Sequence, residues 1–223
     1  MSEAKTEKRA ARRRRVLGPV ALAAAVLTVG VGSGVAYAAV TDNIVPTANY
    51  SPRCIDEGSE PDANGGLCLT DNTAVTYYAD SSGDNMLESN DKAVVNTVMA
   101  DDYNPTQLNT SYDSSPSFSG SAETDVIYQE GTRNLASNVL GMAWCNDAVT
   151  SSKCDQAYIR IRPGYYNRGI TCHETGHAVG LTHGQQASPR LRQNDSRLGC
   201  MQTPVPAGAT LGANNRDNIN AAY

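Results

Sequence analysis

The chain has 223 residues, of which 18 are basic and 23 acidic, and its formal net charge is −5 at neutral pH. The acidic balance argues against binding to nucleic acid or to an anionic membrane surface. The sequence also has no basic stripe, no glycine-rich phosphate loop before a helix and no internal repeat. These features leave a single acidic domain that is long enough to bury a respectable core.

The N-terminal segment has the pattern of a secretory leader. Residues 1–15 carry seven basic and two acidic side chains, and residues 16–41 are uncharged. Ala36-Tyr37-Ala38 is a small-x-small cleavage site, so we predict a signal peptide over residues 1–38 and a secreted mature chain. The mature chain would keep 185 residues and a net charge of −10. The alternative is an uncleaved run that anchors the protein in a membrane; with cleavage, we expect no stable membrane association.

The first part of the mature chain is expected to be irregular. Residues 39–72 are predicted to form an N-terminal arm with a disulfide loop, ahead of a catalytic domain at residues 73–223. β-Branched and aromatic residues predict a strand over 73–78, and Ser82 or Asp84 would cap a helix that reaches about Ala100. The oxygen-rich residues 80–85 could hold calcium. They are also the usual residues of polar turns, so we predict a turn there and no calcium site.

The second part of the chain alternates short strands with two helices. Strands are predicted over residues 108–112, 125–128, 139–144 and 157–161, with a serine-rich loop at 111–121. The last two strands would frame a loop closed by a disulfide. A closing helix is expected over residues 214–222, with Asn214 or Asn215 near its cap. This succession of elements predicts a small α/β domain.

All three histidines of the chain lie within residues 173–183. On a helix, residues i and i+4 share one face, so His173 and His177 can reach the same metal ion. Glu174 is placed to hold a metal-bound water rather than the metal. Gly180 can adopt a left-handed conformation that ends the helix and lets His183 approach as the third ligand. Three neutral imidazoles and one open position predict a catalytic zinc site, because a structural site is closed by a fourth protein ligand.

Residues 173–183 resemble the signature of the metzincin clan of zinc endopeptidases, H-E-x-x-H-x-x-G-x-x-H followed by a methionine turn. Every fixed position is present, and residues 199–204 match the turn, with Met201 at its centre. The resemblance implies an α/β (α+β) metzincin-like fold: a small mixed twisted sheet, an active-site helix and a C-terminal helix. It also implies that Met201 forms a floor beneath the zinc and that residues 201–206 wall a specificity pocket. Gly184 leaves the subfamily open, and the short catalytic region is most similar to small secreted bacterial enzymes of the matrixin or snapalysin sort.

The six cysteines form an even set, which in an exported chain implies disulfides, and six cysteines allow fifteen pairings. Proximity in the sequence favours two small loops and leaves a third pair that would join the active-site helix to the methionine turn. A zinc thiolate from Cys172 or Cys200 is the rival interpretation, although three histidines already complete the usual catalytic set. The favoured pairs are Cys54–Cys68, Cys145–Cys154 and Cys172–Cys200.

These observations together predict a monomeric, secreted zinc metalloendopeptidase that acts on polypeptide substrates. Zinc would lower the pKa of a bound water to about 7, and Glu174 would accept its proton as general base. Backbone pairing along Gly141, Met142 and Ala143 would align the substrate. The alternatives are a catalytically weak extracellular binding module and an amidase of cell-wall peptides. Retention of Glu174 beside the ligands argues against the first, and the methionine turn favours an endopeptidase over the second.

Overall fold

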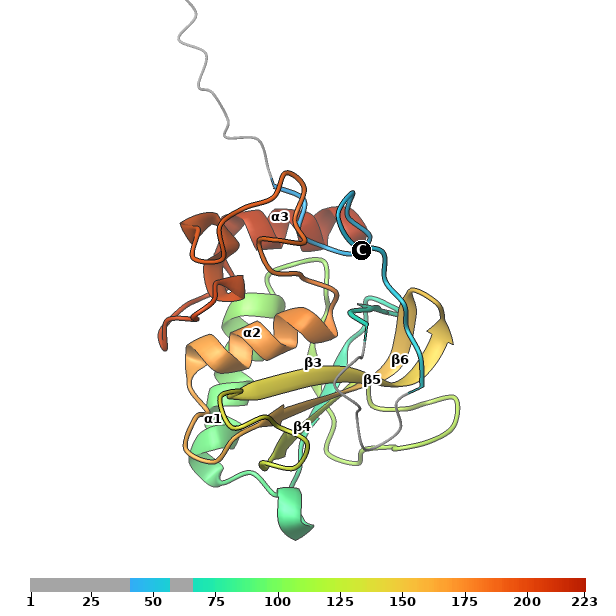
Figure 1. Cartoon of the computed structure of the whole chain (residues 1–223). Helices are drawn as coiled ribbons and strands as arrows, with labels where there is room; N and C mark the ends of the chain where they lie inside the picture. The colour runs from blue at the N-terminus through green and yellow to red at the C-terminus, as the bar shows by residue number, and fades with distance from the viewer. Residues whose placement is uncertain (1–40, 57–65) are drawn as a thin grey trace, which may run out of the picture. The chain divides into compact units, whose positions relative to one another are not determined.

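The computed structural model describes residues 41–56 and 66–223, which belong to one compact unit (Figure 1). The expected leader, residues 1–38, lies outside the described residues. Within the described ranges, no helix combines the length and the apolar character that crossing a membrane requires.

A mixed, mostly parallel sheet is the framework of the described part of the chain, in agreement with the α/β class predicted from the sequence. Its order is β1-β6-β4-β2-β3, with parallel pairing throughout, and β5 pairs antiparallel with β6. The strands are β1 (Leu69–Thr70), β2 (Thr76–Ala79), β3 (Ser111–Tyr112), β4 (Val126–Glu130), β5 (Gly141–Thr150) and β6 (Lys153–Ile161).

Strand β5 lies at an edge, since β6 is its only strand partner among the residues described. Side chains alternate between the two faces of a strand. Met142 and Trp144 pack on one face with Ile127 and Tyr158, whereas Gly141 is on the other face and lies against helix α2. This alternation places Gly141 on the strand face that meets helix α2.

Helix α2 packs against strands β5 and β6, and Figure 1 shows it between the sheet and α3. Helix α1 (Ser89–Val98) continues into a π-helical turn (Met99–Tyr103), α2 spans Arg168–Ala178 and α3 spans Gly212–Ala222. Short 3-10 turns occur at Gly83–Asn85 and Ser196–Met201. The main core lies between helices and sheet, and its fully buried members include Val95, Val98, Met99, Tyr103, Tyr128, Ile159, Ile161, Cys172, Leu181, Leu198 and Met201.

The predicted start of the first helix is wrong. Of the two expected caps, Ser82 precedes the 3-10 turn and Asp84 lies within it, and the α-helix begins only at Ser89. The chain is extended at Met86, and the buried Leu87 donates its N–H to the carbonyl of Asp80 at 2.9 Å. Burial of Leu87 therefore delays the helix, a tertiary effect that capping residues alone do not reveal.

The region between Cys145 and Cys154 is a hairpin and not the expected loop. Strands β5 and β6 run through both cysteines, and the chain turns at Ser151 and Ser152. The other strands deviate less: the one expected at 73–78 lies at 76–79, and the one expected at 108–112 shortens to 111–112. The serine-rich stretch that follows Tyr112 is irregular, as expected.

Helix α3 begins earlier than predicted, with Leu211 and not Asn214 or Asn215 at its cap position. The amides of both asparagines have other partners. Asn214 bonds to the backbone of Thr41, and Asn215 donates to the carbonyls of Leu198 and Leu211. Side chains of the typical capping type are used here to hold distant segments together.

Candidate metal centre and cleft

Helix α2 begins and ends at residues suited to those positions. Asn167 accepts a hydrogen bond from Ile170 N at 3.1 Å and caps the N-terminus. Gly180, with φ of 90°, follows the last turn, and Leu181 N then bonds back to Gly176 O at 2.7 Å. A Cβ at Gly180 would also approach Leu69 Cδ2 to 2.8 Å. Glycine is therefore required where the chain leaves α2 towards His183.

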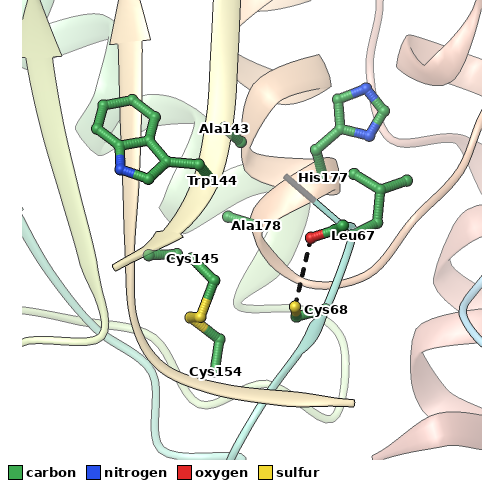
Figure 2. Close-up of a pocket in the computed structure, with 10 residues that line it drawn as sticks. Leu67, Cys68, Ala143, Trp144, Cys145, Cys154, His177 and Ala178 are labelled. Carbon is green, nitrogen blue, oxygen red and sulfur yellow. Dashed lines mark hydrogen bonds between the residues drawn. A yellow bond between two sulfur atoms is a disulfide. The ribbon is translucent and has the colours of Figure 1, made fainter. Parts of the chain in front are cut away.

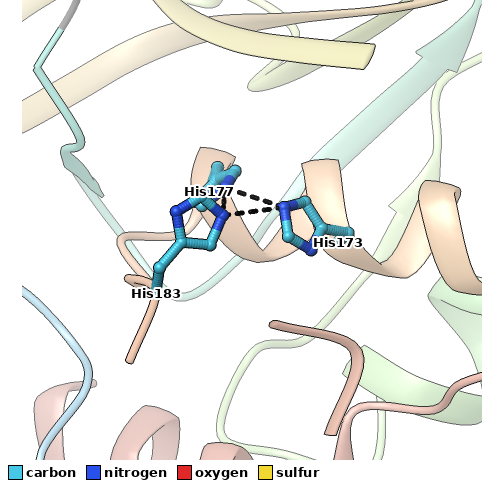
Figure 3. Close-up of side chains that lie close together, drawn as sticks. All are labelled: His173, His177 and His183. Atoms are coloured by element: carbon cyan, nitrogen blue, oxygen red, sulfur yellow. Dashed lines mark hydrogen bonds between the residues drawn. The ribbon is translucent and has the colours of Figure 1, made fainter. Parts of the chain in front are cut away.

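The three histidines converge, as Figure 3 shows. The Nε2 atoms of His173 and His177 are 3.1 Å apart, and the Nε2 of His183 lies 3.0 Å from the first and 3.1 Å from the second. The Nδ1 atom of His173 lies 2.7 Å from Cys200 O, and that of His177 lies 2.9 Å from Leu181 O. Carbonyl oxygens only accept, so both Nδ1 atoms carry the proton and both Nε2 atoms present a lone pair.

The electrostatics of the cluster keep the imidazoles neutral. Burial, followed by the nearby His183, lowers the pKa of His173 to about 4. Burial and both neighbours hold the pKa of His177 well below its usual value, and burial lowers the pKa of His183. Neutral imidazoles are the form that binds a metal. These three side chains therefore form a possible metal-binding triad.

Glu174 points into the same region from the same helix. Its side chain is 6% exposed, and burial raises its pKa to about 8. A positive charge nearby would instead lower this pKa and favour the ionised carboxylate. The backbone of Gly141 on β5 lies close by: a Cβ there would be 2.7 Å from Glu174 Oε1. Absence of a side chain at Gly141 therefore leaves the space that Glu174 occupies.

Met201 lies directly against α2, beside the ligand-bearing turn. A Cβ on Gly176 would overlap Met201 Sδ, so the sulfur fills the space left by this glycine between His173 and His177. The Cys172–Cys200 disulfide joins the residue before His173 to the residue before Met201. Both sulfurs are buried, and the bond holds the Met201 turn against the helix.

A cavity of about 470 Å³ opens beside the histidines and Glu174. Its mostly apolar walls come from three segments: the approach to and start of β5, the side of α2, and the chain after Met201. Met142 and Ala143, expected to contact substrate, line it together with Gly141. Sequence reasoning missed Ile170 and the residues just before β5, which carry no motif. The further lining residues are Asn138, Val139, Leu140, Ile170, Gln202, Thr203, Pro204 and Val205.

A second, much smaller cavity also borders His177 (Figure 2). Leu67 and Cys68 of the arm face His177 and Ala178 of the α2 helix, with the Cys145–Cys154 disulfide nearby. Its volume is about 10 Å³, which is room for about one water molecule. The cavity is therefore a packing gap, and Cys68 is held there by its disulfide to Cys54. All three disulfides are the pairs that sequence proximity favours, and they are typical of an oxidising compartment.

One other group of side chains with metal-ligand chemistry occurs in the described ranges. Carboxylate oxygens of Glu123, Asp147 and Asp155 lie within 4.8 Å of one another. No sequence motif links these positions, and such acidic groups are common without an ion. The turn at residues 80–85, considered above for calcium, is an ordinary polar turn in which Ser82 N donates to Asp80 Oδ1 at 3.1 Å.

Comparison with known proteins adds no relative: no protein-family model matches the chain, and no curated protein matches it by sequence.

Proposed function

We propose that this protein is a zinc-dependent endopeptidase that hydrolyses polypeptide substrates held in an extended conformation. The observation that carries the proposal is the convergence of three Nε2 atoms within 3.0–3.1 Å of one another, with buried Glu174 beside them and an open cavity alongside. A buried triad that served only the fold would have no need of a carboxyl group and a cavity at the same point.

The donor set fits zinc. Zinc–imidazole bonds of about 2.0–2.1 Å place neighbouring nitrogens of a tetrahedral site about 3.3–3.4 Å apart. The observed separations are a few tenths of an ångström shorter, so the side chains need only open slightly. Three nitrogen ligands with no carboxylate or thiolate among them suit zinc better than calcium or magnesium. His173, His177 and His183 would hold the ion.

When bound, zinc would lower the pKa of a water molecule to about 7 and polarise the carbonyl of the scissile bond. Glu174 would accept a proton from the attacking water and deliver it to the departing amine nitrogen, a role worth about 10²–10⁴ in rate. Burial of Glu174 limits its contact with bulk solvent. The carbonyls of Cys200 and Leu181 fix the two helical imidazoles in the tautomer and orientation that binding needs.

Strand β5 supports the choice of a peptide substrate. It is an edge strand that runs past Glu174 and begins at Gly141, so its outer edge can pair with an extended backbone. The adjoining cavity has Ile170, Leu140 and Val205 in its walls and no lysine or arginine among its lining residues. We therefore expect cleavage beside apolar residues and little cleavage where an acidic side chain would enter the cavity.

The proposal also assigns the protein to a clan of peptidases and to a compartment. The packing of Met201 against Gly176 supports membership of the metzincin clan, for which the motif is the first argument. Three disulfides and the expected leader support action outside the cell as a secreted monomer.

The decisive experiment combines metal analysis with peptide mapping. The purified protein should contain about one zinc per chain, lose activity to a chelator and regain it with zinc. Fragments from a mixed library of unstructured peptides should show internal cleavage next to apolar residues. His183→Ala should lose zinc retention, and Glu174→Gln should retain zinc but lose cleavage.

The outcomes separate the candidate functions. Zinc without cleavage of any peptide would favour a binding module. Cleavage confined to cell-wall peptides would favour an amidase. Absence of any transition metal, together with failure of zinc to confer activity, would contradict the proposal altogether.

A further inference from the structure

The N-terminal arm runs alongside the loop that carries the third histidine. We call residues 42–49 the strap and residues 180–188 the ligand loop. Val45 N donates to Gly180 O at 2.9 Å, and the backbones of Asp42 and Ser188 exchange hydrogen bonds of 3.0 and 2.7 Å. Bridge pairs at Asp42–Ser188 and Ile44–Leu181 make the two segments antiparallel. The strap thus supplies backbone partners along the ligand loop, from the end of α2 to a point beyond His183.

Within this contact, Asn43 bonds to Thr182 of the ligand loop. Its carbonyl accepts from Thr182 N at 2.8 Å and from Thr182 Oγ1 at 3.2 Å, while its Nδ2 donates to Thr182 O at 3.3 Å. Thr182 is the residue immediately before His183, and both Asn43 and Thr182 are fully buried. Thr182 is therefore held at its N–H, its carbonyl and its hydroxyl by a single residue that lies 139 positions earlier.

The other side of Asn43 is fixed by helix α3. Its Oδ1 accepts from Asn218 at 2.7 Å and from Asn214 at 3.1 Å, and its Nδ2 also donates to Asn215 Oδ1 at 3.0 Å. The amide oxygen thus accepts twice and the amide nitrogen donates twice, which uses its full hydrogen-bonding capacity. A fully satisfied buried amide defines one orientation, and any other orientation would leave polar groups unpaired.

We propose that Asn43 is a positioning residue for the third metal ligand and that it acts through Thr182 on His183. This inference rests on the proposed metal-binding function. Whereas α2 fixes His173 and His177 through its own backbone, His183 follows a glycine turn and has no regular element of its own. The strap compensates by tying the ligand loop to α3. Loss of Asn43 should therefore loosen one ligand of the three.

The test compares zinc release among variants of the full chain. Zinc-loaded protein is mixed with excess chromophoric chelator, at a temperature where every variant is fully folded. Asn43→Ala should release zinc about tenfold faster or more, because residues that orient a ligand typically affect metal affinity by 10–100-fold. Val95→Ala is the control: it removes part of a fully buried core side chain in α1 and should leave the release rate within about twofold.

A double-mutant comparison asks whether Asn43 acts through His183. In a His183→Ala background, adding Asn43→Ala should change zinc affinity by less than about twofold, because the ligand that it positions is already gone. The visible absorption of Co²⁺-loaded protein gives a second readout, since it depends on the ligand set: it should change in Asn43→Ala and not in Val95→Ala. Thr182→Val removes only the hydroxyl bond to Asn43 and carries the test if Asn43→Ala does not fold; we expect release about three- to tenfold faster.

Release from Asn43→Ala at the wild-type rate would overturn the inference, as would equal acceleration in Val95→Ala or full additivity with His183→Ala. Those results leave the proposed function intact, provided that the wild-type protein retains zinc through its histidines. Wild-type protein that binds no zinc would instead overturn the proposed function.

Discussion

Replacement of Gly141 by alanine tests the geometry of the cleft without removing any polar group. An ideal Cβ at this position would lie 2.7 Å from Glu174 Oε1, 2.8 Å from Cγ and 2.9 Å from Cδ. Ordinary van der Waals contact begins at 3.4 Å. The carboxyl group of Glu174 must therefore retreat by about 0.7 Å or more. Because Gly141 has no positive φ, alanine fits the backbone there without strain.

A displacement of this size should act on kcat. Misplacement of a reacting group by about 1 Å can cost about 10²-fold in rate, so we expect kcat to fall about 10–100-fold, equivalent to about 1.4–2.7 kcal/mol in the activation barrier. The KM should change less than about threefold, since the backbone groups of β5 remain. Zinc content should stay the same, because no ligand is touched. Steady-state kinetics on a quenched fluorogenic peptide, with metal analysis and thermal melting, measure all three quantities.

Two controls identify the cause. Gly208→Ala adds the same methyl group at an exposed glycine with open space around it, and should have no effect on kcat. Glu174→Ala removes all three clashing atoms, so adding Gly141→Ala to it should lower the residual kcat little further. The reasoning is refuted if Gly141→Ala keeps kcat within about twofold of wild type, or if it lowers kcat by the same factor in the Glu174→Ala background as in the wild-type protein.

Three further predictions concern the base, the disulfide and the acidic cluster. Glu174→Gln should lower kcat by about 10²–10⁴-fold while zinc content and melting temperature stay near wild type; retention of a tenth of the activity would contradict its role as a base. Removal of the Cys172–Cys200 bond, which spans 28 positions, should lower the free energy of unfolding by about 3–4 kcal/mol and speed zinc release; a loss below about 1 kcal/mol in urea titration would show that the bond does not constrain this segment. Burial, followed by repulsion from Asp147 and Asp155, raises the pKa of Glu123 in the folded protein. Below the pKa of Glu123 in the unfolded chain this carboxyl has no destabilising effect, and it destabilises the fold as pH rises through the folded-state pKa. Glu123→Gln should therefore raise the melting temperature by about 1–4 °C at pH 7 and by nothing near pH 4; an equal gain at both pH values would argue against charge repulsion as the cause.

The histidine triad was predictable because its geometry is local. One helical turn brings His173 and His177 together, and one glycine returns the chain to His183, so eleven consecutive residues determine the triad. The disulfides were predictable for a related reason, since neighbouring cysteines left only one pair over. The α/β class followed from alternating strand and helix patterns.

The remaining features depend on contacts between distant residues. Gly141 and Glu174 are 33 positions apart, and only pairing of β5 with β6 beside α2 places them together. Asn43 and Asn218 are typical loop and cap residues, and their sequence context does not reveal a buried amide cluster. Residues 145–154 are rich in turn formers, so their strands become evident only from the pairing. Tertiary contacts outweigh local propensity at each of these places.

The pairing of the strap with α3 determines when the protein can finish folding. Within the strap, Asn43 Oδ1 accepts hydrogen bonds from Asn214 and Asn218, across separations of 171 and 175 residues, so the beginning of the described chain is fixed by its end. At synthesis rates of about 5–20 residues per second, the strap must wait on the order of 10–30 s before its partners exist. A nascent chain therefore carries the histidines before it can complete the framework around His183. Under the proposed function, the site would become active only after α3 has joined the fold, so an incompletely folded chain would not yet cut polypeptides around it.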